Sequence, residues 1–215
     1  MQKHNKNISF SIASILVLNA ISIFGKDADL YKTEKQRLKG IASQHESYVK
    51  EFISDPLEEL GEYLAKGLNL LADELAPEKK EEVKKIAKKH KEKLKSISKE
   101  VEKTVKNHKK NLHELAKDLS PHSIPKIEAV AEQHKKDLDA AAQKTVHAGK
   151  KLDDKIIATS KNLTPEHAQR AKALSTEHKE ELEKTAAKIN NAGEQNKKVL
   201  KHLAADASKK KKALK

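Results

Sequence analysis

Hydrophobic residues recur at helical spacing along most of this chain. Between residues 83 and 115 the apolar positions are separated by three, four or seven residues, apart from a single-residue step. At ~100° per residue they fall within one stripe roughly 120° wide, whereas a strand would need sustained alternation. The pattern therefore predicts an amphipathic α-helix. The apolar residues of this stripe are Val83, Ile86, Ala87, Leu94, Ile97, Val101, Val105, Leu112 and Leu115.

The same pattern occurs several times in the chain. A Leu-x-Pro sequence stands at residues 75–77, 119–121 and 163–165, so successive copies are 44 residues apart. A fainter copy begins at Leu30, 45 residues before the first of these. Self-similarity at a fixed period is typical of repeat architectures. The sequence therefore predicts an all-α protein of four amphipathic helical repeats over residues 30–206.

The prolines and glycines suggest where the helices begin and bend. We expect Pro121 and Pro165 to lie in the first helical turn, with Ser120 and Thr164 as N-caps. Gly149 and Gly193 occupy the same repeat position, and each weakens a helix by about 1 kcal/mol relative to Ala, so they offer a second bend. Two arrangements follow from this pattern. The long helices pack as an antiparallel bundle, or they form a kinked extended array.

Residues 1–25 form a segment of their own. Two lysines precede an apolar run over residues 8–24, and Gly25 follows it. This order predicts a secretory signal peptide, cleaved after Ser22 or Gly25. The apolar run is short for a membrane span of about 20 residues, which makes an uncleaved anchor the alternative. We expect the mature protein to be secreted, or to lie in another compartment reached through the secretory pathway.

The remaining chain divides by composition into three parts. Residues 26–74 are the divergent first repeat and carry all aromatic residues of the mature chain. Residues 75–206 hold the three Pro-opened repeats, and residues 207–215 form a basic tail. The aromatic residues either nucleate a bundle core or enter a bilayer interface. They are Tyr31, Tyr48, Phe52 and Tyr63.

Composition and charge narrow the functional classes. Charged residues make up 36% of the chain and aromatics 3%, with no Cys and no Trp, which excludes disulfides and Cys-based zinc sites. No nucleophile–base pair or Gly-rich phosphate loop stands out, so we expect no enzyme, no catalytic residue and no cofactor. The net charge of +13 favours anionic partners such as lipid head groups. The lysines expected to contact such a surface are Lys209, Lys210, Lys211, Lys212 and Lys215.

Histidines mark the apolar stripe of every repeat. His45, His90, His134 and His178 share one repeat position near the middle of the stripe, and His108 reaches the same face. They are polar spots within a thin core, or a pH switch that loosens helix contacts near pH 6, or a metal or haem site between helices. In a closed antiparallel bundle, His45 and His134 would share one level and His90 and His178 the other. Burial would then lower their pKa values.

Several residues carry a resemblance to a known class of proteins. The phrase Leu112-His113-Glu114-Leu115, followed by Leu119-Ser120-Pro121, resembles the helix junctions of the apolipoprotein A and E class. The Ala/Lys-rich composition is also similar to that of insect apolipophorins. One difference is that Lys85, Lys99, Lys103 and Lys110 lie in the middle of the polar face. The resemblance implies a lipid-binding bundle of exchangeable helices.

These observations favour a secreted, non-enzymatic protein whose amphipathic helices bind lipid or another anionic surface. Two other classes remain open. One is an extended protective helical protein similar to late-embryogenesis-abundant proteins, which share the Ala/Lys/Glu bias. The other is a secreted adhesin or effector acting through helical grooves or its basic tail. Self-association is compatible with each class, and no specific nucleic-acid motif is present.

Overall fold

The computed structural model describes residues 31–120 and 122–213, and the side chains of residues 211–213 are not included in this description. The predicted signal peptide of residues 1–25 therefore lies outside the described residues, as do Leu30, Pro121 and Lys215. The described part consists of helices and contains no strand. None of its helices is both long enough and apolar enough to span a membrane.

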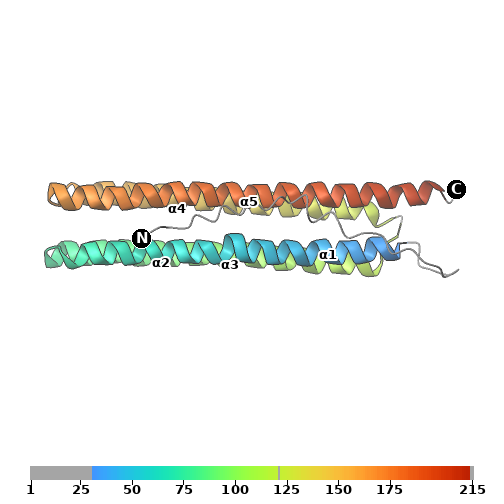
Figure 1. Ribbon diagram of the computed structural model, residues 1–215, viewed down its shortest axis with the longest axis horizontal. Coiled ribbons are helices and arrows are strands. Elements are labelled where there is room, and N and C mark those ends of the chain that lie inside the picture. Colours follow the sequence, from blue (N-terminus) through green and yellow to red (C-terminus); the bar gives the residue numbers. More distant parts are fainter. Residues whose placement is uncertain (1–30, 121, 214–215) are drawn as a thin grey trace, which may run out of the picture.

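Four helical rods run along the long axis of the molecule (Figure 1). The first rod is continuous and comprises α1 (Lys32–Val49), the π-helix η2 (Lys50–Ser54) and α2 (Asp55–Asp73). The other rods are α3 (Pro77–Lys117), α4 (Ile124–Ser160) and α5 (Pro165–Ala213). Because short connections join them, the rods run alternately up and down as an antiparallel four-helix bundle. The predicted all-α fold is confirmed in its closed-bundle form.

Each rod packs against the rods before and after it, and α5 returns to α1 and α2 to close the ring. In Figure 1, α4 and α5 form one row, while α3 and the α1–α2 rod form the other. The diagonal pairs, α1–α2 with α4 and α3 with α5, are therefore parallel. Side chains that meet across a diagonal lie at the centre of the core.

The predicted stripe of α3 faces the interior. Seven of its nine apolar residues are buried, and the other two, Ile86 and Leu115, are partly buried. The mid-face lysines Lys85, Lys99 and Lys103 are exposed, as expected. Burial of these stripes against one another is what stabilises helices whose surfaces are otherwise charged.

The start of α4 differs from the expected start. A helix beginning at residue 121 would place Pro125 in its second turn, where Pro lacks the required N–H and clashes with the preceding turn. The helix begins instead at Ile124, which puts Pro125 in the first turn. Ser120 is therefore not an N-cap. The hydroxyl of Ser123 holds the turn by donating to the Ser120 carbonyl oxygen at 3.0 Å.

The expected cap of α5 is confirmed. The backbone N–H of His167, three residues on, donates to Thr164 Oγ1 at 3.4 Å. Ala76 precedes α3 and provides no side-chain cap, because alanine has no side-chain oxygen.

Gly149 and Gly193 are not bend points, because α4 and α5 run through them without interruption. They allow close helix contact instead. A Cβ at Gly149 would lie 3.3 Å from Leu182 Cδ1, and one at Gly193 would lie 3.4 Å from the Cα of Lys135. The missing side chains therefore let α4 and α5 approach closely.

The π-helix accounts for the extra residue of the first repeat. Val49 corresponds to Leu94 at an offset of 45 residues, whereas Ile53 corresponds to Ile97 at an offset of 44. The change of offset falls within η2, and a π-turn accommodates one more residue than an α-turn. Pro56 lies in the first turn of α2, where the helix tolerates it, and α2 continues from η2 without a break.

The aromatic residues of the first repeat divide between the core and the surface. Tyr31 is buried, and Tyr48 packs partly buried against the core. Phe52 and Tyr63 are exposed. The divergent repeat thus contributes to the core and also presents aromatic rings to solvent.

Candidate functional site

The core of the bundle contains several large polar side chains. Five of the histidines are buried, and each of the four rods carries at least one of them. These buried residues are His45 on α1, His90 and His108 on α3, His134 on α4 and His178 on α5. They are the only buried residues with a ring that can take up a proton near neutral pH, within a core that is mostly aliphatic in the described residues.

His45 and His134 meet across one diagonal of the bundle. Their Nε2 atoms are 2.8 Å apart, and the two rings stand nearly perpendicular to each other. One Nε2–H must donate and the other Nε2 must accept, so the pair holds together only while at least one ring is neutral. The shared level expected for a closed bundle is confirmed, and the contact between the two rings adds to it.

The other diagonal at this level joins His108 to Asn196. His108 Nε2–H donates to the amide oxygen of Asn196 over 2.8 Å, and this bond is buried. The rings of His108 and His134 are stacked with centroids 3.8 Å apart and planes 5° apart. All four rods therefore contribute one side chain to this level. We call His45, His108, His134 and Asn196 the four-residue layer.

A second layer crosses the core nearer the other end of α3. His90 and His178 share this level, as expected for a closed bundle, and their Nε2 atoms are 2.9 Å apart. The residues that correspond to His108 and Asn196 in the other two repeats are Leu64 and Leu152, and both are buried. This two-histidine layer of His90 and His178 therefore lacks the second polar pair.

Burial lowers the pKa of every histidine in both layers, because the interior disfavours the charged ring. The pKa falls to about 3 for His45 and His90, and to about 4 for His108 and His178. The pKa of His134 is also lowered by burial and then by its neighbours His108 and His45.

Charged and polar neighbours modify this effect of burial. The hydrogen bond that His108 donates to Asn196 raises the pKa of His108, as does the carboxylate of Asp137, while Glu181 raises the pKa of His178. His178 and Lys155 lower the pKa of His90 further. In each case burial remains the larger cause, so these rings are neutral at pH 7.

Some ring nitrogens in the layers have no hydrogen-bond partner among the described residues. They are the Nδ1 atoms of His108, His134 and His178. Protonation would give a buried N–H with no acceptor as well as a buried charge, and both are unfavourable in a low-dielectric interior. The layers are therefore arranged to be stable only when the imidazoles are neutral.

A small apolar cavity lies beside the four-residue layer, between α1 and α5. Its volume is about 80 Å³, and His45 and Asn196 contribute to its wall. The side chains of Ile41, Tyr48 and Val199 line it with several others. The layer is thus packed less completely on its α1–α5 side.

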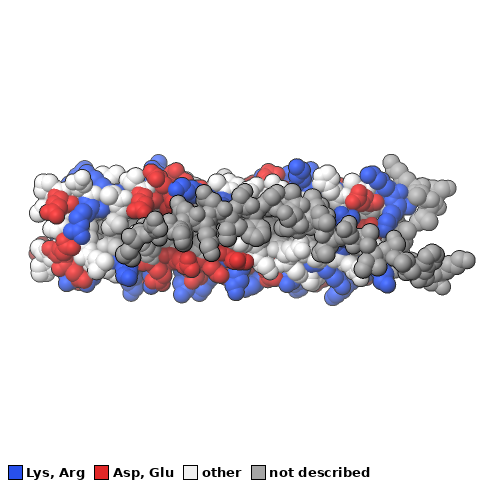
Figure 2. Space-filling view, viewed as in Figure 1, with Lys and Arg blue, Asp and Glu red and all other residues white. Residues whose placement is uncertain are grey.

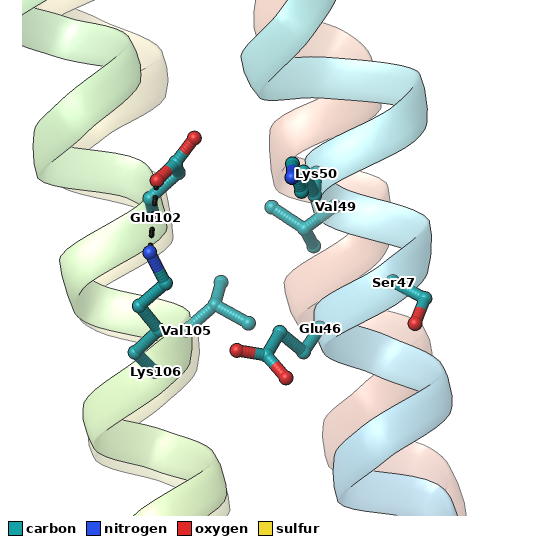
Figure 3. Close-up of a pocket in the computed structure, with 7 residues that line it drawn as sticks. All are labelled: Glu46, Ser47, Val49, Lys50, Glu102, Val105 and Lys106. Atoms are coloured by element: carbon teal, nitrogen blue, oxygen red, sulfur yellow. Dashed lines mark hydrogen bonds and ion pairs between the residues drawn. The ribbon is translucent and has the colours of Figure 1, made fainter.

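A second hollow of about 280 Å³ lies between α1 and α3, beside the π-helix (Figure 3). Val49 and Val105 point toward each other across it. Val105 stands at the repeat position that Gly61, Gly149 and Gly193 occupy elsewhere, so its side chain keeps α3 from approaching α1 as closely. The carboxylates at the hollow are paired, Glu46 with Lys109 at 2.7 Å and Glu102 with Lys106 at 3.1 Å.

Within the described ranges, no group of three or more His, Cys, Asp or Glu side chains is placed so that it could hold a metal ion. The histidine layers are instead hydrogen-bonded pairs. This geometry fits two of the interpretations drawn from the sequence, hydrogen-bonded polar spots in the core and a pH switch.

The basic tail differs from the separate segment that the sequence suggested. Residues 207–213 continue α5, and Lys210 forms an ion pair at 2.7 Å with Glu34, a buried residue of α1. Lys209 is exposed, 3.9 Å from Asp206. The side chains of Lys211, Lys212 and Lys215 lie outside the described residues. At least one tail lysine therefore connects helix ends as well as contributing charge.

Asn196 is the site residue that the sequence pattern did not indicate. It stands 88 residues after His108, at the same repeat position, on a stripe of α5 that is otherwise largely apolar. The sequence did offer one sign of it, a polar amide at a position where the helical pattern predicts a buried residue. Its interpretation required a partner, and only the packing of α3 against α5 supplies one.

No protein-family model, curated protein or solved structure matches this chain. The histidine layers and the faces around them are therefore the features from which function is inferred.

Proposed function

We propose that this is a secreted, non-enzymatic amphipathic-helix protein that binds anionic lipid surfaces when its bundle opens, and that acidification favours opening. The observation that carries the proposal is the four-residue layer, in which three imidazoles meet at the centre of the core. Aliphatic residues at these positions could give a core of similar stability, since replacing both partners of a buried hydrogen bond by apolar groups can be nearly neutral.

The sign of the pH effect follows from the lowered pKa values. A histidine whose folded pKa lies below its unfolded pKa stabilises the fold fully above about pH 6.5. That contribution is lost as pH falls through 6.5 toward the folded values of about 3 to 4. Each such group removes about 1.4 kcal/mol per pH unit, so five together remove about 7 kcal/mol at pH 5.5. A domain stable by about 5–15 kcal/mol would approach its opening threshold.

Opening would expose long apolar stripes. The helices α3, α4 and α5 have 41, 37 and 49 residues, which at ~1.5 Å per residue makes them about 62, 56 and 74 Å long. Many buried residues are alanines, such as Ala87, Ala131 and Ala141, and small side chains contribute under about 1 kcal/mol each at ~25 cal/mol per Å². Contacts with lipid can therefore replace the contacts between helices at little net cost.

The positive charge of the protein favours anionic over neutral lipid. The chain carries a net +13, and protonation of the buried imidazoles would add further positive charge to the apolar side. Each Lys or Arg near an anionic membrane contributes about 1 kcal/mol of attraction, which salt screens. Anionic lipid therefore suits the opened protein better than neutral lipid.

Vesicle flotation tests the proposal. The mature chain is mixed with neutral phosphatidylcholine vesicles, or with vesicles containing phosphatidylserine, at pH 7.5 and 5.5 and at low and high salt. We expect flotation with anionic vesicles at pH 5.5 and low salt, at least tenfold above the other conditions. Equal flotation at both pH values would contradict acid opening, and no flotation under any condition would contradict lipid binding.

Exposed histidines provide a matched control. Replacing His122, His147 and His202 with Gln removes three imidazoles without touching either layer, since all three side chains are exposed. This variant should float as the parent does. Circular dichroism of the parent in buffer at pH 7.5 distinguishes this proposal from the protective-protein alternative. The proposal predicts a helical spectrum, whereas the alternative predicts a disordered chain.

A further inference from the structure

The four rods are joined in pairs. The first rod and α3 form one helical hairpin, and α4 and α5 form the other. We call them the N-hairpin, residues 32–117, and the C-hairpin, residues 124–213, and residues 118–123 connect them. They are the lower and the upper row of Figure 1. The contacts within each hairpin differ in kind from the contacts between the two.

Glycines bring the two helices of each hairpin close together. A Cβ at Gly61 would lie 3.4 Å from a Cα atom of α3, one at Gly149 would lie 3.7 Å from a Cα atom of α5, and one at Gly193 would lie 3.4 Å from a Cα atom of α4. Between the hairpins, a Cβ at Gly67 would instead have the side chain of Leu174 as its nearest neighbour. Helix backbones therefore approach closely within a hairpin, except at the hollow beside η2.

The polar bonds of the histidine layers run between the hairpins. They join His45 to His134, His90 to His178, and His108 to Asn196. The stacked rings of His108 and His134 also belong to different hairpins. The buried imidazoles thus lie in one plane, which separates two closely packed halves of the molecule.

The same three bonds join equivalent positions of the two hairpins. The bonded residues are 89, 88 and 88 positions apart. Two repeats of 44 residues make 88, and the first pair spans the extra residue of η2 as well. An approximate two-fold axis along the bundle therefore relates the hairpins, and side chains on this axis meet their own counterparts. Identical subunits associate through interfaces of this self-complementary kind.

We propose that the face between the hairpins is also an interface between two copies of this protein. When the bundle opens, the C-hairpin of one copy takes the place of the C-hairpin of another, and the exchange is mutual. One copy then contributes His45 and His108 to a four-residue layer, and its partner copy contributes the other two side chains. The exchange keeps the contacts within and between hairpins, and it changes only the course of residues 118–123.

The connection is long enough for this exchange. Six extended residues reach about 20 Å at ~3.3 Å per residue, so two bundles fit end to end at the ends where residues 118–123 lie. The helix α5 is about 74 Å long at ~1.5 Å per residue, and the exchanged dimer would be about 150 Å long. Basic side chains lie near the end of α5 on the right of Figure 2, where the two bundles would meet. High salt should therefore favour the dimer, because it screens their repulsion.

Concentration decides between closure and exchange. The short connection keeps the two hairpins of one chain at an effective concentration on the order of 1 mM. An opened chain should therefore exchange with other chains at about 1 mM and close on itself at about 10 μM. A closed bundle has no free face of this kind, so exchange requires opening.

Refolding of the full mature chain at two concentrations tests the proposal. The bundle is opened in urea at about 1 mM or at about 10 μM, and the urea is then removed at pH 7.5. Size-exclusion chromatography with light scattering should show at least tenfold more dimer at the higher concentration. Small-angle X-ray scattering should show a particle about twice as long as the monomer. Dilution at pH 7.5 should leave the dimer intact, whereas a second urea pulse at about 10 μM should return it to monomer.

Engineered disulfides test whether the hairpins exchange as units. The chain has no Cys, and an ideal Cβ at Gly149 lies 3.7 Å from the Cβ of Leu182, within the range of about 3.5–4.5 Å that disulfides need. The variant Gly149→Cys/Leu182→Cys, oxidised before the pulse, should form as much dimer as the parent, because no helix has to leave its hairpin. Gly193→Cys/Leu138→Cys, with the corresponding atoms 3.5 Å apart, is a second lock of the C-hairpin.

Three results would overturn the proposal. They are the absence of dimer after the urea pulse at about 1 mM, a dimer that dissociates on simple dilution, and the loss of dimer in both locked variants. An acid pulse in place of urea forms a separate arm, which rests on the acid opening of the proposed function. Dimer after urea but not after acid would contradict acid opening and leave the exchange standing. Dimer after neither pulse would overturn the exchange, while vesicle flotation still decides the proposed function.

Discussion

The imidazoles of His45 and His134 meet at the centre of the bundle with their Nε2 atoms 2.8 Å apart, although 89 residues separate them in sequence. They belong to helices that face each other diagonally and run parallel. Their hydrogen bond therefore exists only when all four rods are closed around it. Protonation of both rings would replace this bond with repulsion between two buried cations.

Removing the histidines of the repeat position should flatten the response of stability to pH. Below pH 6.5, each of these histidines makes the free energy of unfolding fall by about 1.4 kcal/mol per pH unit. Replacing His45, His90, His134 and His178 with Leu should remove these four contributions to the slope. Thermal melting between pH 7 and 5 measures the change. If the variant melts with the same pH profile as the parent, these imidazoles do not respond to pH in the folded protein.

The two layers should contribute unequally to acid sensitivity. The four-residue layer holds three imidazoles with lowered pKa values, and the two-histidine layer holds two. His90→Leu/His178→Leu should therefore remove about two-fifths of the slope of unfolding free energy against pH, and the triple Leu variant of the other layer about three-fifths. Urea unfolding at a series of pH values measures both slopes. Equal slopes would show that the layers are not independent proton sites.

Asn196 and His108 should depend on each other. Asn196→Leu leaves the Nε2–H of His108 buried without an acceptor, which should destabilise the fold by about 1–3 kcal/mol at pH 7.5. The double variant Asn196→Leu/His108→Leu should recover most of this loss, because the corresponding residues Leu64 and Leu152 pack in the other layer. A double-mutant cycle by urea unfolding measures the coupling. Additive effects would mean that the bond contributes nothing to stability.

The glycines should differ according to the space around them. A Cβ at Gly40 would meet nothing within 4 Å, so Gly40→Ala should stabilise the fold by up to about 1 kcal/mol through helix propensity. Gly193→Leu should destabilise by about 1–3 kcal/mol, because the side chain would press on the backbone of Lys135. Thermal melts at pH 7.5 compare the two. A tolerated Gly193→Leu would show that α4 and α5 can separate there without loss.

The C-terminal lysines should affect both stability and surface binding. Deleting residues 207–215 removes the partner of the buried Glu34 as well as several positive charges. We expect a lower melting temperature and weaker flotation with anionic vesicles at low salt. Replacing Lys209, Lys211 and Lys212 with Ala retains Lys210, and this variant should lose flotation while keeping its melting temperature. If neither variant alters flotation, the tail is not a surface contact.

The connection before α4 shows a local effect that the repeat pattern concealed. The repeat placed a helix start at residue 121, but Pro125 cannot lie in the second turn of a helix. This rule moves the start to within one turn of Pro125, and the helix begins at Ile124. Here the sequence contained the answer, and the regular period led to the wrong residue.

Periodicity along the chain was sufficient to predict the helices and their inward stripes. For a closed antiparallel bundle, one of the two arrangements left open, it also predicted that His45 shares a level with His134 and His90 with His178. These properties depend on local helical geometry and on the up-and-down course that short connections impose. Only the tertiary structure decided the bond between His108 and Asn196 and the close approach at Gly193. Each of these depends on the rotation and spacing of one helix against another. Those quantities are set by the packing of all four rods together, and no single stretch of sequence contains them.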